Sequence, residues 1–133
     1  MADEGKKRIL VVDDDTDLQA LVKTLLERVG IEAIPALDVA SAVQILRRRP
    51  LPDLVLLDLM LPDISGLELL RQIRTKDVFE HLPIIILSAL ADPKEIRQGL
   101  DMGADRYLTK PYIAHNLVKT VQEVLRTGRR LNA

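Results

Sequence analysis

The chain has 133 residues, which suits one domain that buries roughly two-thirds of the surface its unfolded form exposes. It is 47% hydrophobic and 29% charged with a net charge of −1, no cysteine and three aromatic residues, which argues against disulfides, thiolate metal sites and nucleic-acid binding. Its apolar stretches are too short for a membrane span, and its charged N-terminus lacks the apolar core of a signal peptide, so we expect a cytoplasmic protein without membrane contact.

Short and long apolar segments alternate along the chain. The first short run, RILVVD at 8–13, predicts a strand, and the next segment carries Leu18, Leu21, Val22, Leu25, Leu26 and Val29 at the spacing of a buried helical stripe. Further short runs predict strands at 30–36, 53–58, 83–88 and 105–109. The segments between the runs predict helices at roughly 16–29, 38–49, 65–76, 92–102 and 112–127.

Helix start and stop signals agree with these segments. Thr16 to Gln19 and Ser65 to Glu68 match the capping box, in which a hydroxyl and an acid or amide satisfy the first backbone N–H groups. Asp92 before Pro93 fits an N-cap followed by the first helical position. Two glycines fit left-handed C-terminal caps: Gly30 and Gly103.

Strict alternation of strand and helix predicts a single-domain α/β fold, a doubly wound (βα)5 unit with a parallel sheet covered on both faces. Three of the strands are apolar throughout, as expected for buried parallel strands. The domain is expected to span 1–133, with a core of about 7–127 and short flexible ends. Ligands in such folds bind outside the carboxyl ends of the strands.

Polar residues close four of the predicted strands. Asp58 lies inside the apolar stretch LVLLDLMLPD, where a carboxylate needs an explanation, and it closes the third strand. The remaining strand ends supply more carboxylates, a hydroxyl and an ammonium: Asp13, Asp14, Asp15, Ser88, Thr109 and Lys110, with Pro111 next. All of these side chains are expected at one edge of the sheet.

Clustered carboxylates repel one another, so a partly dry crevice holding them needs a cation. Mg²⁺ takes oxygen ligands and leaves positions for phosphate oxygens, whereas zinc is disfavoured because the two histidines, His81 and His115, lie away from this edge. Lys110 and Ser88 could donate to an anion that bridges metal and protein, and a phosphoryl group fits best.

Each of these residues also has an ordinary structural explanation. Asp15 is better read as a helix cap, Lys110 alone as a solvated charge, and Tyr107 alone as a core aromatic. The joint placement at strand ends favours function for the set. Two arginine groups are read as solvated helix ends rather than nucleic-acid tails: 47–49, and Arg126, Arg129 and Arg130.

The pattern resembles the receiver domain of two-component response regulators, the CheY-like family. The resemblance covers nearly the whole chain, through ILVVDDD (9–15), LVLLDLMLPDISG (54–66), PIIILSA (83–89) and GADRYLTKPY (103–112). It implies the flavodoxin-like strand order 2-1-3-4-5.

The resemblance also implies roles at the strand ends. Asp58 would accept a phosphoryl group from a sensor histidine kinase or a phosphotransfer protein. Asp13 and Asp14 would hold Mg²⁺ together with Asp58 and the backbone carbonyl of Met60. Lys110 would pair with Asp58 and then with the phosphoryl oxygens.

Three more positions would complete the switch. Ser88 would hydrogen-bond the phosphoryl group, Tyr107 would change rotamer on activation, and the bond from Lys110 to Pro111 would be cis. The surface of the fourth helix, fifth strand and fifth helix would then change shape. Apolar Met60 and Leu90 would tune the lifetime of the phosphoryl group.

The implied protein is a signalling switch rather than an enzyme, since it would promote only its own phosphorylation and dephosphorylation. It would control a downstream effector or output domain and could form a homodimer on phosphorylation, without binding nucleic acid itself. The residues after the fifth helix contain no output module, so a stand-alone receiver and a piece of a longer regulator both stay open.

Two other functions stay open from the sequence. One is a Mg²⁺-dependent phosphohydrolase with an Asp nucleophile, although such enzymes usually carry a second acid at the position that Met60 occupies. The other is a receiver-like module used only for binding.

Overall fold

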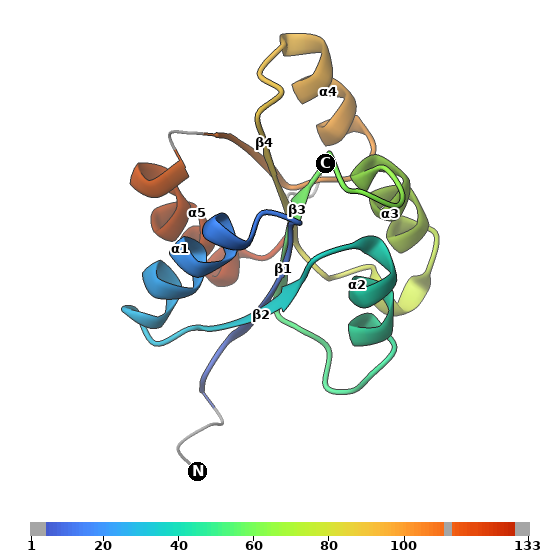
Figure 1. The fold of residues 1–133 in the computed structure, drawn as a ribbon. Coiled ribbons are helices and arrows are strands. Elements are labelled where there is room, and N and C mark those ends of the chain that lie inside the picture. The colour runs from blue at the N-terminus through green and yellow to red at the C-terminus, as the bar shows by residue number, and fades with distance from the viewer. Residues whose placement is uncertain (1–4, 111–112, 130–133) are drawn as a thin grey trace.

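The computed structural model describes residues 5–110 and 113–129, and they form a five-stranded parallel sheet (Figure 1). The strand order is β2-β1-β3-β4-β5, which confirms the expected doubly wound topology. The strands are β1 Arg8–Val12, β2 Glu32–Ala36, β3 Leu54–Asp58, β4 Ile84–Ser88 and β5 Arg106–Thr109. Parallel pairing brings all the carboxyl ends to one edge.

Helices cover both faces of the sheet (Figure 1). One face carries α1 Thr16–Glu27 and α5 Ile113–Thr127. The other carries α2 Val39–Leu46, α3 Gly66–Arg74 and α4 Pro93–Asp101, with the short 3-10 helix η1 Asp77–Phe79 after α3. Among the described residues no helix combines the length and the apolar character that crossing a bilayer requires.

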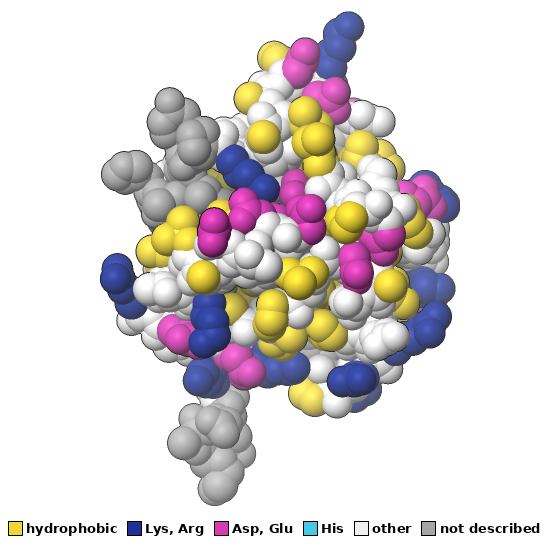
Figure 2. Space-filling view, viewed as in Figure 1, with side chains coloured by type: hydrophobic (Ala, Val, Ile, Leu, Met, Phe, Trp, Pro, Cys, Tyr) yellow, Lys and Arg dark blue, Asp and Glu magenta, His cyan; other side chains and the backbone are white. Residues whose placement is uncertain are grey.

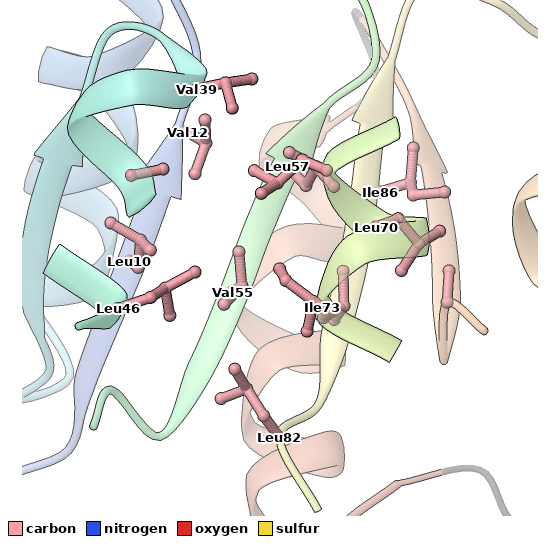
Figure 3. Close-up of a cluster of buried hydrophobic side chains, with 14 of the residues drawn as sticks. Leu10, Val12, Val39, Leu46, Val55, Leu57, Leu70, Ile73, Leu82 and Ile86 are labelled. Carbon is pink, nitrogen blue, oxygen red and sulfur yellow. The ribbon is translucent and has the colours of Figure 1, made fainter. Parts of the chain in front are cut away.

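The central strands divide their side chains between two cores. In β1, Ile9 and Val11 pack toward α1 and α5, whereas Leu10 and Val12 pack toward α2 and α3. This alternation follows from the two-residue period of a strand, and it explains why both sets are apolar. Figure 3 shows the second core, in which α2 and α3 meet three strands through Leu10, Val12, Val39, Leu46, Val55, Leu57, Leu70, Ile73, Leu82 and Ile86.

The first helix begins differently from the capping-box prediction. Asp15, not Thr16, is the N-cap, and its carboxylate accepts hydrogen bonds from the backbone N–H groups of Asp17 and Leu18. The cap reading of Asp15 is therefore confirmed. Ser65 caps α3 as predicted, but Glu68 pairs with Arg71. At the start of α1, Asp15 serves as the cap in place of Thr16 because its carboxylate accepts hydrogen bonds from two backbone N–H groups at once.

The second helix is shorter than predicted. It ends at Leu46 with Arg47 as its C-cap, so the rest of 47–49 lies beyond the helix. Pro50 disfavours helical geometry in Arg49, so the helix could not have included the predicted last residue, and it ends earlier than the proline alone requires. Gly30 and Gly103 have φ of 78° and 114°, and Asp92 caps α4 before Pro93, as predicted.

Arg129 is not a solvated helix end. At the amino edge of the sheet, the carboxylate of Asp105 accepts hydrogen bonds from Arg74 Nη2 and Arg129 Nε, both at 3.1 Å. Asp105 also accepts from the backbone N–H of Ile84. The side chain of Asp105 is fully buried, so these partners are what stabilise its charge. Burial and the charge of Arg129 lower the pKa of Arg74 to about 10.

Candidate functional site

The carboxyl edge of the sheet brings the predicted acidic residues together. One carboxylate oxygen from each of Asp13, Asp14 and Asp58 lies within 4.8 Å of the others. Lys110 points into the cluster, with its Nζ 2.9 Å from Asp13 Oδ2 and 3.4 Å from Asp58 Oδ2. Figure 2 shows acidic side chains gathered in the middle of this face beside a basic one. The predicted pairing of Lys110 with Asp58 is thus the longer of its two contacts.

Burial makes this cluster electrostatically demanding. Asp13 is 1% exposed and Asp58 is 5% exposed, whereas Asp14 faces solvent. Burial raises the pKa of Asp58, and the charge of Asp13 adds to the rise. The backbone N–H of Met60 and the ammonium of Lys110 act in the opposite direction without cancelling it. Asp58 is therefore a carboxylate that a further positive charge would favour.

Lys110 stays protonated in this setting. Burial alone lowers the pKa of Lys110, but its hydrogen bond to Asp13 and the charges of Asp13 and Asp58 outweigh burial and raise the pKa. One ammonium thus bridges two buried carboxylates that come from different strands. Its backbone N–H donates to the carbonyl of Ser88, which fixes the end of β5 against the end of β4.

Gln19 holds the end of β1 in place, a role that the sequence prediction missed. Its amide Nε2 lies 2.8 Å from the carbonyl oxygen of Val11, 3.0 Å from that of Asp13 and 3.2 Å from that of Ala36. The N–H of Asp13 donates to Ala36 as well. The sequence signal for this role was that Gln19, a polar residue, directly follows Leu18 of the apolar stripe. Both lie in the first turn of α1, the turn nearest the carboxyl edge of the sheet.

The loop after Asp58 is tied down at both ends. Asp58 Oδ1 accepts a hydrogen bond from the N–H of Met60, and the N–H of Gly66 donates to the carbonyl of Leu59. A Cβ on Gly66 would collide with the carbonyl oxygen of Asp58 and lie 2.8 Å from Leu59 Cα. Only glycine allows this close approach of two backbones.

Asp63, in the same loop, was also missed by the sequence prediction. Its carboxylate accepts hydrogen bonds from the first backbone N–H groups of α2, those of Val39 and Ala40. The hydrogen bond from Val39, helped by those from Ala40 and Ile64, lowers the pKa of Asp63 against the opposing effect of burial. The loop that carries Asp58 is thereby anchored to a helix that follows a different strand.

Ser88 and Tyr107 are linked through one residue of the β4–α4 loop. The N–H of Leu90 donates to Ser88 Oγ at 3.1 Å, and the hydroxyl of Tyr107 donates to the carbonyl of Leu90 at 2.6 Å. Ser88 is fully buried, and Tyr107 is partly exposed. Burial raises the pKa of Tyr107, with contact to Ser88 opposing it. A shift of the β4–α4 loop would therefore change the hydrogen bonds of both Ser88 and Tyr107.

The donor set fits a hard divalent cation. Three carboxylates meet, one of them open to solvent, and the pKa of Asp58 is raised as expected for a site short of positive charge. The Met60 side chain is 61% exposed and takes no part in the cluster. The carbonyl role of Met60 stays a prediction, and the cis bond at Pro111 lies outside the described residues, as does the side chain of His115.

Comparisons with known proteins agree with this geometry. The family model "Response regulator receiver domain" matches residues 9–122. The phosphate regulon transcriptional regulatory protein PhoB of Pseudomonas aeruginosa is 39% identical over 120 residues, which are 90% of this chain and 52% of the relative. The DNA-binding dual master transcriptional regulator RpaA of Synechocystis is 36% identical, over 93% of this chain and 51% of the relative. The chain thus spans about half the length of these relatives.

Solved structures show the same fold over nearly their whole length. A response regulator from Chloroflexus aurantiacus superposes with a TM-score of 0.85 at 31% identity, covering 91% of this chain and 98% of that one. The receiver domain of the Francisella response regulator 1452 gives a TM-score of 0.83 at 33% identity, covering 91% and 98%. The chain therefore belongs to the response regulator receiver domain family of two-component signalling.

Proposed function

We propose that the chain is a phosphoacceptor switch in which Asp58 receives a phosphoryl group. The observation that carries this proposal is the cluster around Asp58. Two further carboxylates and the ammonium of Lys110 converge on one buried carboxylate at the carboxyl edge of the sheet. Phosphoryl transfer needs positioning and charge neutralisation more than covalent chemistry, and this arrangement supplies both.

The donor would be a phosphohistidine on a sensor histidine kinase or phosphotransfer protein. A carboxylate oxygen of Asp58 attacks phosphorus while the N–P bond breaks, and the electron pair returns to the imidazole nitrogen. Asp13, Asp14 and Asp58 would hold Mg²⁺, with the carbonyl of Met60 as a further ligand. When bound, Mg²⁺ supplies positive charge against the phosphoryl oxygens. Lys110 would turn from Asp13 toward those oxygens.

Switching would pass through the linked pair Ser88 and Tyr107. When the hydroxyl of Ser88 donates a hydrogen bond to a phosphoryl oxygen, the β4–α4 loop is pulled inward, and Leu90 moves with it. The hydrogen bond from Tyr107 to the carbonyl of Leu90 then either breaks or draws the Tyr107 side chain along with the loop. The surface of α4, β5 and α5 changes shape as a result. Inverting a 1:99 population requires about 5.5 kcal/mol of preference for the active state.

The readout would be a partner protein or an output domain. PhoB and RpaA are named as transcriptional regulators, and this chain matches about half of each. We infer that the chain acts in the cytoplasm, controls such an output through its switched surface, and could dimerise when phosphorylated. The domain would promote only its own phosphorylation and dephosphorylation, so we do not propose that it is an enzyme that turns over a substrate.

The proposal is tested by intact mass after incubation with acetyl phosphate and Mg²⁺. Wild type should gain the mass of one phosphoryl group, and Asp58→Asn should gain none. Asp63→Asn is the matched control, because it changes an exposed carboxylate in the same loop. Absence of an adduct on wild type, or an adduct retained by Asp58→Asn, contradicts the assignment. Continuous hydrolysis of a generic phosphate ester would favour the phosphohydrolase instead.

A further inference from the structure

A groove of about 460 Å³ lies between α2, α3 and η1, away from the carboxylate cluster. Its floor is apolar and well packed: Leu46, Leu69, Ile73 and Phe79 are each buried to more than nine-tenths. Val78 at its edge is 50% exposed. Its volume is within the range of about 300–1,000 Å³ that is usual for ligand pockets.

The charged residues that line this groove are all cations. Arg47, Arg49 and Lys76 line it, and no acidic residue does. Within residues 5–110 and 113–129, none of these three side chains has a hydrogen bond or an ion pair. Other cations of the chain do find acids, as Lys23 does with Glu27. The groove therefore concentrates positive charge that the fold itself leaves uncompensated.

Figure 2 shows this concentration on the surface. Lys and Arg side chains gather at the lower right of the face, in the region that α2 and the end of α3 occupy in Figure 1. Helix dipoles account for part of it, because Arg47 and Lys76 follow the carboxyl ends of α2 and α3. They do not account for the hollow between the cations, where the exposed side chain of Val78 stands beside an apolar floor.

We propose that this groove binds an acidic amphipathic helix of a partner protein. Apolar side chains of the helix would enter the groove and pack against Val78 over the apolar floor, and its carboxylates would meet Arg47, Arg49 and Lys76. Nucleic acid fits less well, because the one aromatic of the groove, Phe79, is only 8% exposed and offers no stacking face. The proposal does not depend on phosphorylation of Asp58.

The test uses the whole chain and a fluorescein-labelled helical peptide of about 15 residues, with leucines on one face and glutamates flanking them. Fluorescence anisotropy should show saturable binding that weakens as salt is added. Two other probes separate the alternatives: the same peptide with lysine at every glutamate, and single-stranded DNA. Neither should bind. Failure of the acidic peptide to bind, or equal binding of the DNA, overturns the proposal.

Arg49→Glu and Arg48→Glu form a matched pair of variants. Both residues are exposed and neighbouring, but only Arg49 lines the groove. Arg49→Glu should weaken peptide binding by about tenfold, and Arg48→Glu should leave it close to wild type. Circular dichroism checks that both variants fold. Equal weakening by the two variants would mean that the peptide senses net charge rather than the groove.

Asp58→Asn separates this proposal from the proposed function. Peptide binding by Asp58→Asn should equal that of wild type, because the groove lies at the opposite ends of α2 and α3 from Asp58. Loss of binding in this variant would refute an independent site. Failure of phosphorylation on wild type would leave peptide binding unchanged.

Discussion

Single side chains decide how a buried carboxylate is tolerated at this edge. The two oxygens of Asp58 have different partners, since Oδ1 accepts from the N–H of Met60 and Oδ2 faces Lys110. Lys110 is shared with Asp13 and lies closer to it. The positive charge within reach is therefore divided, and the folded protein keeps Asp58 ionised at a cost to its own stability.

This cost predicts how the stability of Asp58→Asn depends on pH. The folded pKa of Asp58 is raised above its ordinary value of 3.8, so the folded state binds the proton more tightly than the unfolded state does. The contribution of Asp58 to stability is fully present below pH 3.8 and is lost as the pH rises through the folded pKa. Without metal, Asp58→Asn should therefore unfold at higher temperature than wild type at pH 7.

Thermal unfolding followed by circular dichroism from about pH 3 to about pH 8, a range that covers the carboxyl pKa, checks this. The advantage of Asp58→Asn should shrink toward the acid end. Asp63→Asn should show the reverse sign, because hydrogen bonds lower the pKa of that carboxylate. An Asp58→Asn protein less stable than wild type at neutral pH contradicts the electrostatic account.

Mg²⁺ should reverse the order of these two proteins. A ligand that binds only the folded state stabilises it by about 2.7 kcal/mol at a hundredfold excess over its Kd. Wild type should gain unfolding temperature as Mg²⁺ is added, and Asp58→Asn, which has lost one carboxylate of three, should gain less. Calorimetric scans with Mg²⁺ and then with excess chelator measure it. Equal gains would show that the ion binds elsewhere.

At the scale of elements, the β3–α3 loop is fixed both by a close backbone approach at Gly66 and by the carboxylate of Asp63. Gly66 begins α3 directly against the carbonyl of Asp58, and Asp63 joins the loop to the start of α2. The position of Asp58 thus depends on two helices besides its own strand. A loop held this way moves little on its own, which leaves the β4–α4 loop as the mobile part of the proposed switch.

Gly66→Ala should destabilise the protein strongly. The added Cβ meets backbone atoms of Asp58 and Leu59, which cannot rotate away as a side chain can. Overpacking of this kind costs about 1–3 kcal/mol, and backbone contact places this site at the upper end. Urea unfolding measures the loss, and Gly5→Ala, with nothing within 4 Å, is the neutral control. A near-neutral Gly66→Ala would mean that the loop can rearrange freely.

At the scale of the whole molecule, the two edges of the sheet carry opposite arrangements of charge. The carboxyl edge has excess carboxylates around one lysine, whereas the amino edge has Asp105 held between Arg74 and Arg129. Arg129 also donates to the carbonyls of Glu80 and Gly103. The segment after α5 is thereby fastened to the loops that precede β4 and β5.

Asp105→Asn should cost about 3 kcal/mol of unfolding free energy, since it leaves two largely buried guanidinium groups without their carboxylate. Asp101→Asn, at the exposed end of α4, should change stability little. Equilibrium unfolding in urea compares the two variants. The proposed phosphorylation of Asp58 should be unaffected in folded Asp105→Asn, because the carboxylate cluster lies at the opposite edge of the sheet from Asp105. An equal effect of the two variants would show that the amino-edge cluster adds nothing to stability.

Much of the fold followed from local patterns. The apolar runs predicted the strands because every residue of a central parallel strand faces one of two cores, as Ile9 and Leu10 do. Helix ends were less predictable. Asp15 and Thr16 are both good caps, and the choice between them depends on where β1 releases the chain.

The residues that make up the site could be predicted from the sequence, but the contacts between them could not. Asp13, Asp14, Asp58 and Lys110 each lie at or just after the end of a strand, and parallel strands end at one edge, so the sequence by itself determined which groups meet. Only the tertiary structure decided their pairing. Lys110 prefers Asp13, Gln19 ties β1 to β2, and Arg129 returns to Asp105 rather than to solvent, since such contacts depend on distances between segments far apart in the chain.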